Sequence, residues 1–289
     1  MPDALSPPCP APPPAERWRF AHREWRVRRP KPFVLVIEGE ADANPEVPTD
    51  YLHEVLLDPA HREDFLQLMD RTGLVVCLNV ASRHPTYRDV RGRSSKGRLS
   101  QGEYYHHDGC SSPTKPRLVE IRCPHQTVAR SVATAVAPHH AVLRAMLQVL
   151  PADLDDPAVF GPWRRRLADG PWPSDAELDT LQGLLNRTVR RKLPAEAARA
   201  YFREVDVAAD AYVVPWSMGE SRLIANANAG VTMQHRRAYL QENRPGVPNG
   251  SLVKRWTHEE LPLPGQSVDA ALVASFCSEE DGTCHRARE

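Results

Sequence analysis

Residues 104–109, with the sequence Tyr-Tyr-His-His-Asp-Gly, constrain this chain most, because they place an imidazole and a carboxylate two positions apart. In an extended segment the side chains alternate between two faces, so His106 and Asp108 point to one side and His107 points to the other. A bulge in the segment would exchange the roles of His106 and His107. The pattern therefore predicts two ligands of one metal ion, which needs at least one further ligand from elsewhere in the chain.

A second strand-like run, residues 231–237, carries one more histidine, His235, two positions before Arg237. Two imidazoles and one carboxylate on one side of an iron ion leave three positions open, which is the ligand arrangement of non-haem Fe(II) oxygenases. We therefore predict that His106, Asp108 and His235 are the metal ligands and the catalytic residues.

Charge, hydropathy and cysteine usage exclude several classes of protein. The chain of 289 residues has 37 basic and 37 acidic side chains, so its zero net charge provides no basis for binding nucleic acid or an anionic membrane. No apolar run approaches the roughly 18 residues of a membrane helix. The N-terminus lacks the pattern of a signal peptide, which predicts a cytoplasmic protein. The 6 cysteines include no CxxC pair, which favours reduced thiols over a zinc ribbon or a disulfide framework.

The order of predicted elements indicates one large domain. Residues 1–16 are rich in proline and are expected to be disordered, and residues 17–289 are expected to form a single β-rich domain. Helical residues at about 150–210 form an insertion or lid in that domain. Strands are predicted at 33–37, 74–80, 116–124, 131–136, 211–216, 221–225, 231–237 and 252–256, and helices at 58–72, 138–150, 175–193, 194–208 and 266–278. Asn249-Gly250 indicates a hairpin turn.

This order of motifs resembles that of the Fe(II)/2-oxoglutarate-dependent dioxygenases of the taurine dioxygenase and clavaminate synthase-like group. The likeness runs from about Pro59 to about Trp256 and joins a helix and an apolar strand, the HxD motif, a helical insertion and a distal HxR motif. It implies a mostly β core with flanking helices, folded as a double-stranded β-helix, also called a jelly roll or cupin-like fold. It also implies Fe(II) as the cofactor, with 2-oxoglutarate and dioxygen as co-substrates.

The resemblance further implies a basic residue and a hydroxyl that hold 2-oxoglutarate. The residues that match these roles are Arg255, Arg237, Thr134 and Ser131. Arg255 is preferred to Arg244 and Lys254 because a strand fixes its direction and a guanidinium grips a carboxylate bidentately. The link from His235 to this strand is longer than in the family, so Arg244 and Lys254 stay open, as does the choice between the two hydroxyls.

The implied reaction is the oxidative decarboxylation of 2-oxoglutarate to succinate, coupled to hydroxylation of an unactivated C–H bond. The substrate would be a small polar metabolite, such as an amino acid or another molecule with a carboxylate or phosphate. The arginine-rich residues 82–101 favour an anionic substrate, although a merely solvated loop explains them equally well. Desaturation or ring closure would use the same site, whereas a carboxylate at Asp108 speaks against a halogenase.

Two other classes of protein compete with the oxygenase. A zinc hydrolase could use the same ligands to activate water, with Glu103 as the nearest candidate for a general base. A non-catalytic β-barrel could bind a ligand without any metal. His139 and His140 lie in the first turn of a predicted helix; a pair of histidines can bind metal, but in a first turn we expect exposed side chains. Asn226 precedes the distal strand, where it would form a turn or contact the substrate.

Overall fold

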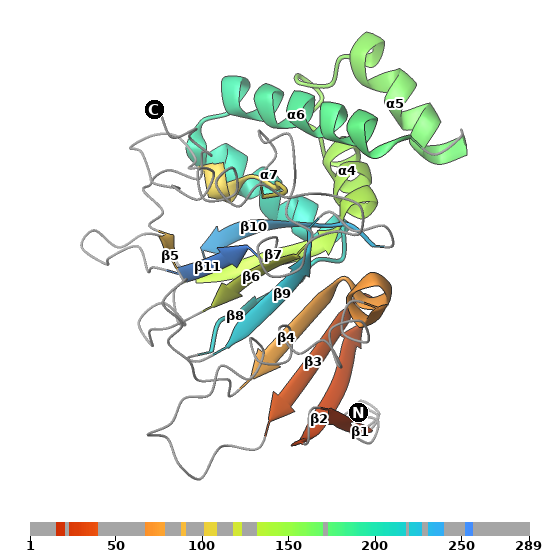
Figure 1. Ribbon diagram of the computed structural model, residues 1–289. Coiled ribbons are helices and arrows are strands. Elements are labelled where there is room, and N and C mark those ends of the chain that lie inside the picture. The colour runs from red at the N-terminus through yellow and green to blue at the C-terminus, as the bar shows by residue number, and fades with distance from the viewer. Residues whose placement is uncertain are drawn as a thin grey trace, which may run out of the picture.

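The described residues of the computed structural model form two β-sheets with helices beyond the smaller one (Figure 1). The structure describes residues 16–20, 23–39, 67–78, 88–90, 101–108, 118–122, 132–169, 173–217, 220–226, 231–239 and 252–256. The strands are β1 (Glu16–Phe20), β2 (Arg23–Lys31), β3 (Val34–Gly39), β4 (Leu74–Leu78), β5 (Arg88–Val90), β6 (Leu118–Arg122), β7 (Val132–Pro138), β8 (Tyr212–Pro215), β9 (Ser221–Ala225), β10 (Met233–Tyr239) and β11 (Leu252–Trp256). The helices are the 3-10 helix η1 (Gln101–Glu103) and α4 (His139–Gln148), α5 (Pro157–Asp169), α6 (Asp175–Lys192) and α7 (Ala195–Ala208).

The larger sheet has the order β1-β2-β3-β4-β9-β6-β11-β5, and the smaller has the order β10-β7-β8. Each described pair is antiparallel except β3 and β4, which are parallel and therefore need a long connection. That connection ends in a helical turn at residues 67–72, and Gly73 ends the helix with a φ of 90°. A side chain at Gly73 would meet the Met233 sulfur at 2.7 Å, so glycine also allows the two sheets to approach.

The hydrophobic core between the sheets takes side chains from both of them. Strands β4 and β9 are buried almost throughout, and Val136, Tyr212 and Trp216 reach the same cluster from the smaller sheet. Arg222 of β9 crosses this core as a fully buried side chain, with its Nε donating to Glu220 and one terminal nitrogen donating to the Thr134 carbonyl oxygen at 3.0 Å. Its guanidinium also lies 4.0 Å from the centre of the Trp216 ring, so this buried arginine ties the two sheets together.

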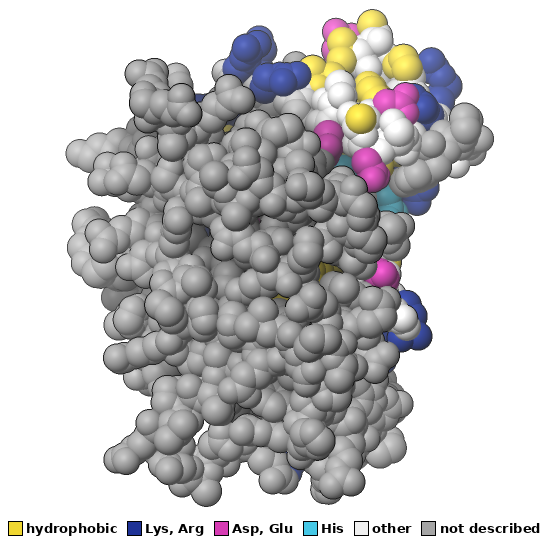
Figure 2. Space-filling model, viewed as in Figure 1, with side chains coloured by type: hydrophobic (Ala, Val, Ile, Leu, Met, Phe, Trp, Pro, Cys, Tyr) yellow, Lys and Arg dark blue, Asp and Glu magenta, His cyan; other side chains and the backbone are white. Residues whose placement is uncertain are grey.

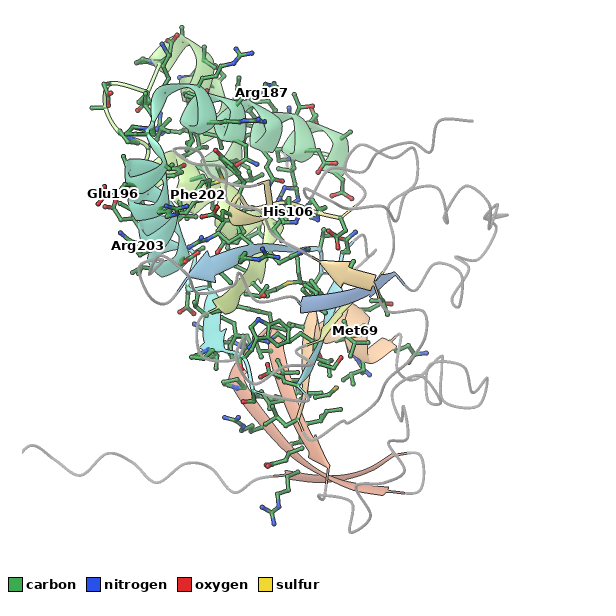
Figure 3. All side chains as sticks on the ribbon, turned by 90° about the vertical axis from the view of Figure 1, so that its left-hand side faces the viewer. Met69, His106, Arg187, Glu196, Phe202 and Arg203 are labelled. Atoms are coloured by element: carbon green, nitrogen blue, oxygen red, sulfur yellow. The ribbon has the colours of Figure 1, made fainter. Side chains whose placement is uncertain are left out.

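A second core fills the space between the smaller sheet and helices α4, α5, α6 and α7. The amphipathic α7 shows the arrangement, since Phe202 points inward and is fully buried whereas Glu196 and Arg203 lie on its exposed side (Figure 3). On the face seen in Figure 2, the described side chains over α5 and the start of α6 mix acidic, basic and apolar types. No described helix has both the length and the apolar character needed to cross a bilayer.

Most predicted strands and helices are confirmed, but strand β5 lies within residues 82–101, which were expected to be a loop, and two further differences concern a helix and a hairpin. Helix α5 was not predicted, because Pro157, Gly161 and Pro162 interrupt its helical pattern. The predicted hairpin of β10 and β11 is not formed, because β11 pairs with β5 and β6 of the other sheet, and Asn249 and Gly250 themselves lie outside the described residues. The predicted helix at 266–278, the start of the helix at 58–72 and nearly all of the proline-rich residues 1–16 lie outside the described residues.

Candidate metal centre

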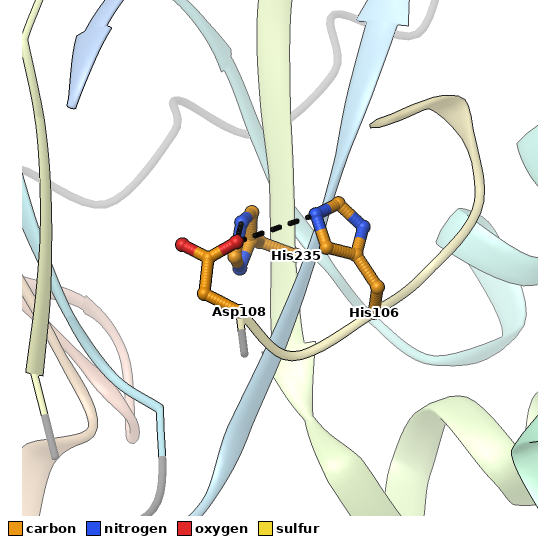
Figure 4. Close-up of side chains that lie close together, drawn as sticks. All are labelled: His106, Asp108 and His235. Carbon is orange, nitrogen blue, oxygen red and sulfur yellow. Dashed lines mark ion pairs between the residues drawn. The ribbon is translucent and has the colours of Figure 1, made fainter. Parts of the chain in front are cut away.

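The side chains of His106, Asp108 and His235 converge at the edge of β10 (Figure 4). His106 and His235 form an isolated antiparallel bridge, in which each backbone N–H donates to the other residue's carbonyl oxygen, at 3.1 and 3.2 Å. The Nε2 atoms of His106 and His235 each lie 3.7 Å from Oδ1 of Asp108. Two segments that are far apart in the sequence therefore present their ligand atoms to one point.

These separations fit the coordination of one ion. Ligands bonded to one ion at about 2.1 Å lie about 3 Å apart at right angles, so the observed 3.7 Å is within about 0.7 Å of the bonded separation. Asp108 and His235 are buried, whereas the side chain of His106 is 19% exposed. The triad is thus embedded on one side and reachable from the side of His106, as an open catalytic site requires.

A backbone contact fixes which nitrogen of His106 faces the triad. Its Nδ1 lies 2.7 Å from the carbonyl oxygen of Tyr104, which can only accept a hydrogen bond. Nδ1 therefore carries the proton, and the lone pair of Nε2 is directed toward Asp108 and His235. This tautomer is the one that can ligate a metal from Nε2.

Asn226 holds Asp108 in place through two backbone hydrogen bonds. Its Oδ1 accepts from the Asp108 N–H at 2.8 Å, and its Nδ2 donates to the Asp108 carbonyl oxygen at 3.1 Å. Asn226 therefore positions a ligand, a role that differs from the turn or the substrate contact expected from the sequence. A partner 118 positions away leaves no local signal in the sequence.

Replacing Asn226 with alanine should reduce the affinity of the triad for Fe(II) by about 10–100-fold, because Asp108 would lose its support. Anaerobic titration with Fe(II) measures this change. Asn186→Ala is the matched control, since Asn186 also anchors this segment, at the Tyr105 carbonyl oxygen, but Gln182 donates to the same oxygen. Equal losses in both variants would show that Asn226 has no special role at Asp108.

The helices support the segment that carries His106 and Asp108. The Tyr105 carbonyl oxygen accepts from Gln182 and Asn186 of α6, and the Tyr104 ring packs edge-on against Phe202 of α7 at 5.4 Å. Glu103 is buried and its carboxylate accepts from Arg199 of α7 at 2.8 Å. This ion pair anchors η1 to the helices and argues against Glu103 as the general base of a zinc hydrolase.

The structure describes some of the residues predicted to bind 2-oxoglutarate and leaves others outside its described part. The register of β10 and β7 sets Arg237 opposite Thr134, on the sheet face to which His235 also points. Both residues are buried, and the Thr134 hydroxyl oxygen accepts from the Trp216 indole at 3.1 Å. Arg255 lies in β11 of the larger sheet, opposite Glu120. Ser131 and Arg244, as well as the side chains of Arg255 and Lys254, lie outside the described part of the structure.

Two neighbouring histidines at the start of α4 differ in exposure. His140 is exposed, as expected, whereas His139 is only 4% exposed, so the prediction that both are exposed is wrong for His139. The cause is His107, which points away from the triad and packs against His139 with ring centres 4.6 Å apart. The predicted alternation of His106, His107 and Asp108 is therefore confirmed, without the bulge that would exchange the two histidines.

Comparison with known proteins found similar solved structures only. No protein-family model matches the chain, and no curated protein matches it. AAD-2, solved in complex with Mn(II) and N-oxalylglycine, is 12% identical with a TM-score of 0.38, over 79% of this chain and 96% of that one. PvcB from Pseudomonas aeruginosa is 13% identical with a TM-score of 0.39, over 78% and 85% of the two chains. Asparagine oxygenase, in complex with Fe(II), 3-hydroxyasparagine and succinate, is 14% identical with a TM-score of 0.36, over 74% and 85%. Of these, PvcB is described as an Fe, alpha-ketoglutarate-dependent oxygenase, and asparagine oxygenase is an oxygenase by name.

Proposed function

We propose that His106, Asp108 and His235 bind Fe(II) and that the protein is a 2-oxoglutarate-dependent oxygenase. The convergence of two imidazoles and one carboxylate on one point, with separations of 3.7 Å, carries this proposal. When bound, Fe(II) would supply the redox chemistry that couples decarboxylation of 2-oxoglutarate to oxidation of a substrate. The residues themselves hold the ion on one side and leave its other side accessible.

Three observations about the residues support the fit to Fe(II). Two neutral nitrogen donors and one carboxylate suit a borderline first-row ion better than Ca²⁺ or Mg²⁺, which prefer oxygen ligands. The Tyr104 carbonyl oxygen orients the His106 ring, and Asn226 orients the backbone of Asp108. Such supporting contacts are typical of sites that hold a metal in a fixed geometry.

The co-substrate would bind beside this triad. Arg237 lies two positions after His235 on the same strand face, with Thr134 opposite it, so this pair is the best supported of the predicted 2-oxoglutarate residues. Arg255 keeps its proposed role for the far carboxylate, with Ser131 as the alternative hydroxyl. We further infer that the two facing sheets are those of a double-stranded β-helix and that the protein is cytoplasmic.

The proposed substrate is a small polar metabolite, such as an amino acid or another molecule with a carboxylate or phosphate, and the proposed reaction is hydroxylation. The limited access at His106, whose side chain is 19% exposed next to buried Asp108 and His235, favours a small molecule. The arginine-rich residues 82–101 would supply the positive charge for an anionic group.

Purified protein should form succinate from 2-oxoglutarate in the presence of Fe(II) and dioxygen, even without its own substrate. Succinate and oxygen uptake are measured with Fe(II), with Zn²⁺ and without metal. Addition of the correct metabolite should then increase succinate formation, so a screen of amino acids and organic acids identifies the substrate. Absence of succinate in every condition, or hydrolysis supported by Zn²⁺, would contradict the proposed function.

A further inference from the structure

A second set of metal-ligand atoms lies on the opposite side of the segment that carries the triad. His107 and His139 are 2% and 4% exposed, and Asp179 of α6 has a side chain that is 33% exposed. The His107 Nε2 atom lies 3.3 Å from Nδ1 of His139 and 3.8 Å from Oδ1 of Asp179, and all three ligand atoms lie within 4.8 Å of one another. We propose that these residues form a second metal site that binds Zn²⁺.

The separations suit a small tetrahedral ion. Nitrogen ligands bonded to zinc at about 2.05 Å lie about 3.3 Å apart in a tetrahedron, which matches the distance from His107 to His139. Two imidazoles and one carboxylate are ligands that zinc commonly takes. The fourth position would face the side of Asp179, which is the exposed member of the cluster.

Hydrogen bonding does not account for the approach of the Asp179 carboxylate to His107, whereas a shared cation does. Besides His139 and Asp179, the amide nitrogen of Gln234 lies 3.2 Å from the same Nε2 atom. Asp179 Oδ1, at 3.8 Å, lies beyond hydrogen-bond distance of His107 Nε2, which is the separation expected of two ligands that face one ion instead of each other. A cation between these residues would be bound by lone pairs of both histidines and of Asp179. The amide nitrogen of Gln234 would still donate to the side-chain oxygen of Gln182.

The position of this site would link it to the first one. His107 stands between His106 and Asp108, and Gln234 directly precedes His235, so the two sites occupy opposite faces of the same pair of segments. The second site would join three elements: the segment at 104–108, the start of α4 and the first half of α6. Bound Zn²⁺ would therefore brace the backbone that positions the Fe(II) ligands.

Zinc content and thermal stability of the full chain test this site without any measurement of turnover. The wild-type protein should bind two Zn²⁺ per chain, one at each site, and Asp179→Asn should bind one. Asp108→Ala, which removes a ligand of the first site only, should also retain one, whereas the double variant should retain none. Saturating Zn²⁺ should raise the Tm of the Asp108→Ala protein by about 5 °C, and this rise should disappear in the double variant.

Two controls use exposed neighbours of the proposed ligands. His140→Ala and Asp175→Asn change the same residue types in α4 and α6 at exposed positions, so both should leave zinc binding unchanged. Tetrahedral Co²⁺ absorbs strongly in the visible region. This absorption should be lost in His139→Ala and Asp179→Asn and retained in the two controls. Unchanged zinc content in Asp179→Asn, or no zinc in Asp108→Ala, would overturn the proposal in favour of a hydrogen-bonded histidine pair.

Discussion

Replacing Asp108 with alanine is expected to abolish succinate formation and to weaken Fe(II) binding by at least about 100-fold. Asp108 Oδ1 is 3.7 Å from the Nε2 atoms of both His106 and His235, so this carboxylate faces both histidines. It is also the only charge that the triad offers to a divalent ion. Residues that hold the ligands in place without touching the ion raise the affinity for the metal by about 10–100-fold. The loss of a direct ligand should therefore lower that affinity further.

Anaerobic Fe(II) titration and succinate measurement check this expectation in parallel. Asp108→Asn keeps the shape of the side chain and its backbone contacts with Asn226 but removes the charge, so it separates loss of the ligand from loss of structure. Asp153→Ala removes an exposed carboxylate and should behave as the wild type. Wild-type Fe(II) affinity in both Asp108 variants would exclude this residue as a ligand.

The sequence predicts the triad because side chains alternate between two faces along an extended segment. Alternation along an extended segment places His106 and Asp108 on one face, and a third histidine in a later strand completes the set, so the three residues could be named without coordinates. The strand at 74–80 could also be predicted, since an apolar run of that length indicates a buried strand.

The residues that the sequence does not predict all depend on long-range contacts. Asn226 reaches Asp108 across 118 positions, and the burial of His139 follows from its contact with His107, 32 positions earlier. A first-turn histidine is exposed in an isolated helix and becomes buried only when another segment packs on it. The same holds for Asp179, which reads as one more polar residue on the exposed face of α6.

Replacing Asp206 with asparagine is expected to lower the free energy of unfolding by about 3–5 kcal/mol, because it leaves the buried guanidinium of Arg236 without a counter-charge. Asp206 of α7 accepts two hydrogen bonds from Arg236, from Nε at 2.8 Å and from a terminal nitrogen, and a third from the Tyr105 hydroxyl at 2.7 Å. The side chain of Arg236 is 4% exposed and that of Asp206 is 10% exposed. The loss would be a large share of the roughly 5–15 kcal/mol by which domains are usually stable.

The ionisation of this cluster supports the expected size of the effect. Burial, followed by the charge of Asp206, raises the pKa of Tyr105 well above its usual value, so its hydroxyl stays protonated and donates. Burial alone would lower the pKa of Arg236, but its hydrogen bonds and ion pair with Asp206 outweigh burial and raise that pKa. Because a guanidinium keeps its charge in proteins, removing the carboxylate leaves the desolvation of Arg236 uncompensated.

Urea unfolding compares Asp206→Asn with a variant of a more exposed ion pair. Asp155 accepts from Arg164 at 2.7 Å, with side chains 27% and 35% exposed, so Asp155→Asn should cost only about 0.2–1 kcal/mol. Combining Asp206→Leu with Arg236→Met should restore much of the stability, because no buried charge is then left unpaired. Equal losses in Asp206→Asn and Asp155→Asn would mean that water reaches Arg236.

The Asp206→Asn protein should also bind Fe(II) more weakly, because Arg236 directly follows His235 in β10. A weaker affinity for Fe(II) would show that α7 stabilises the strand that carries the third ligand.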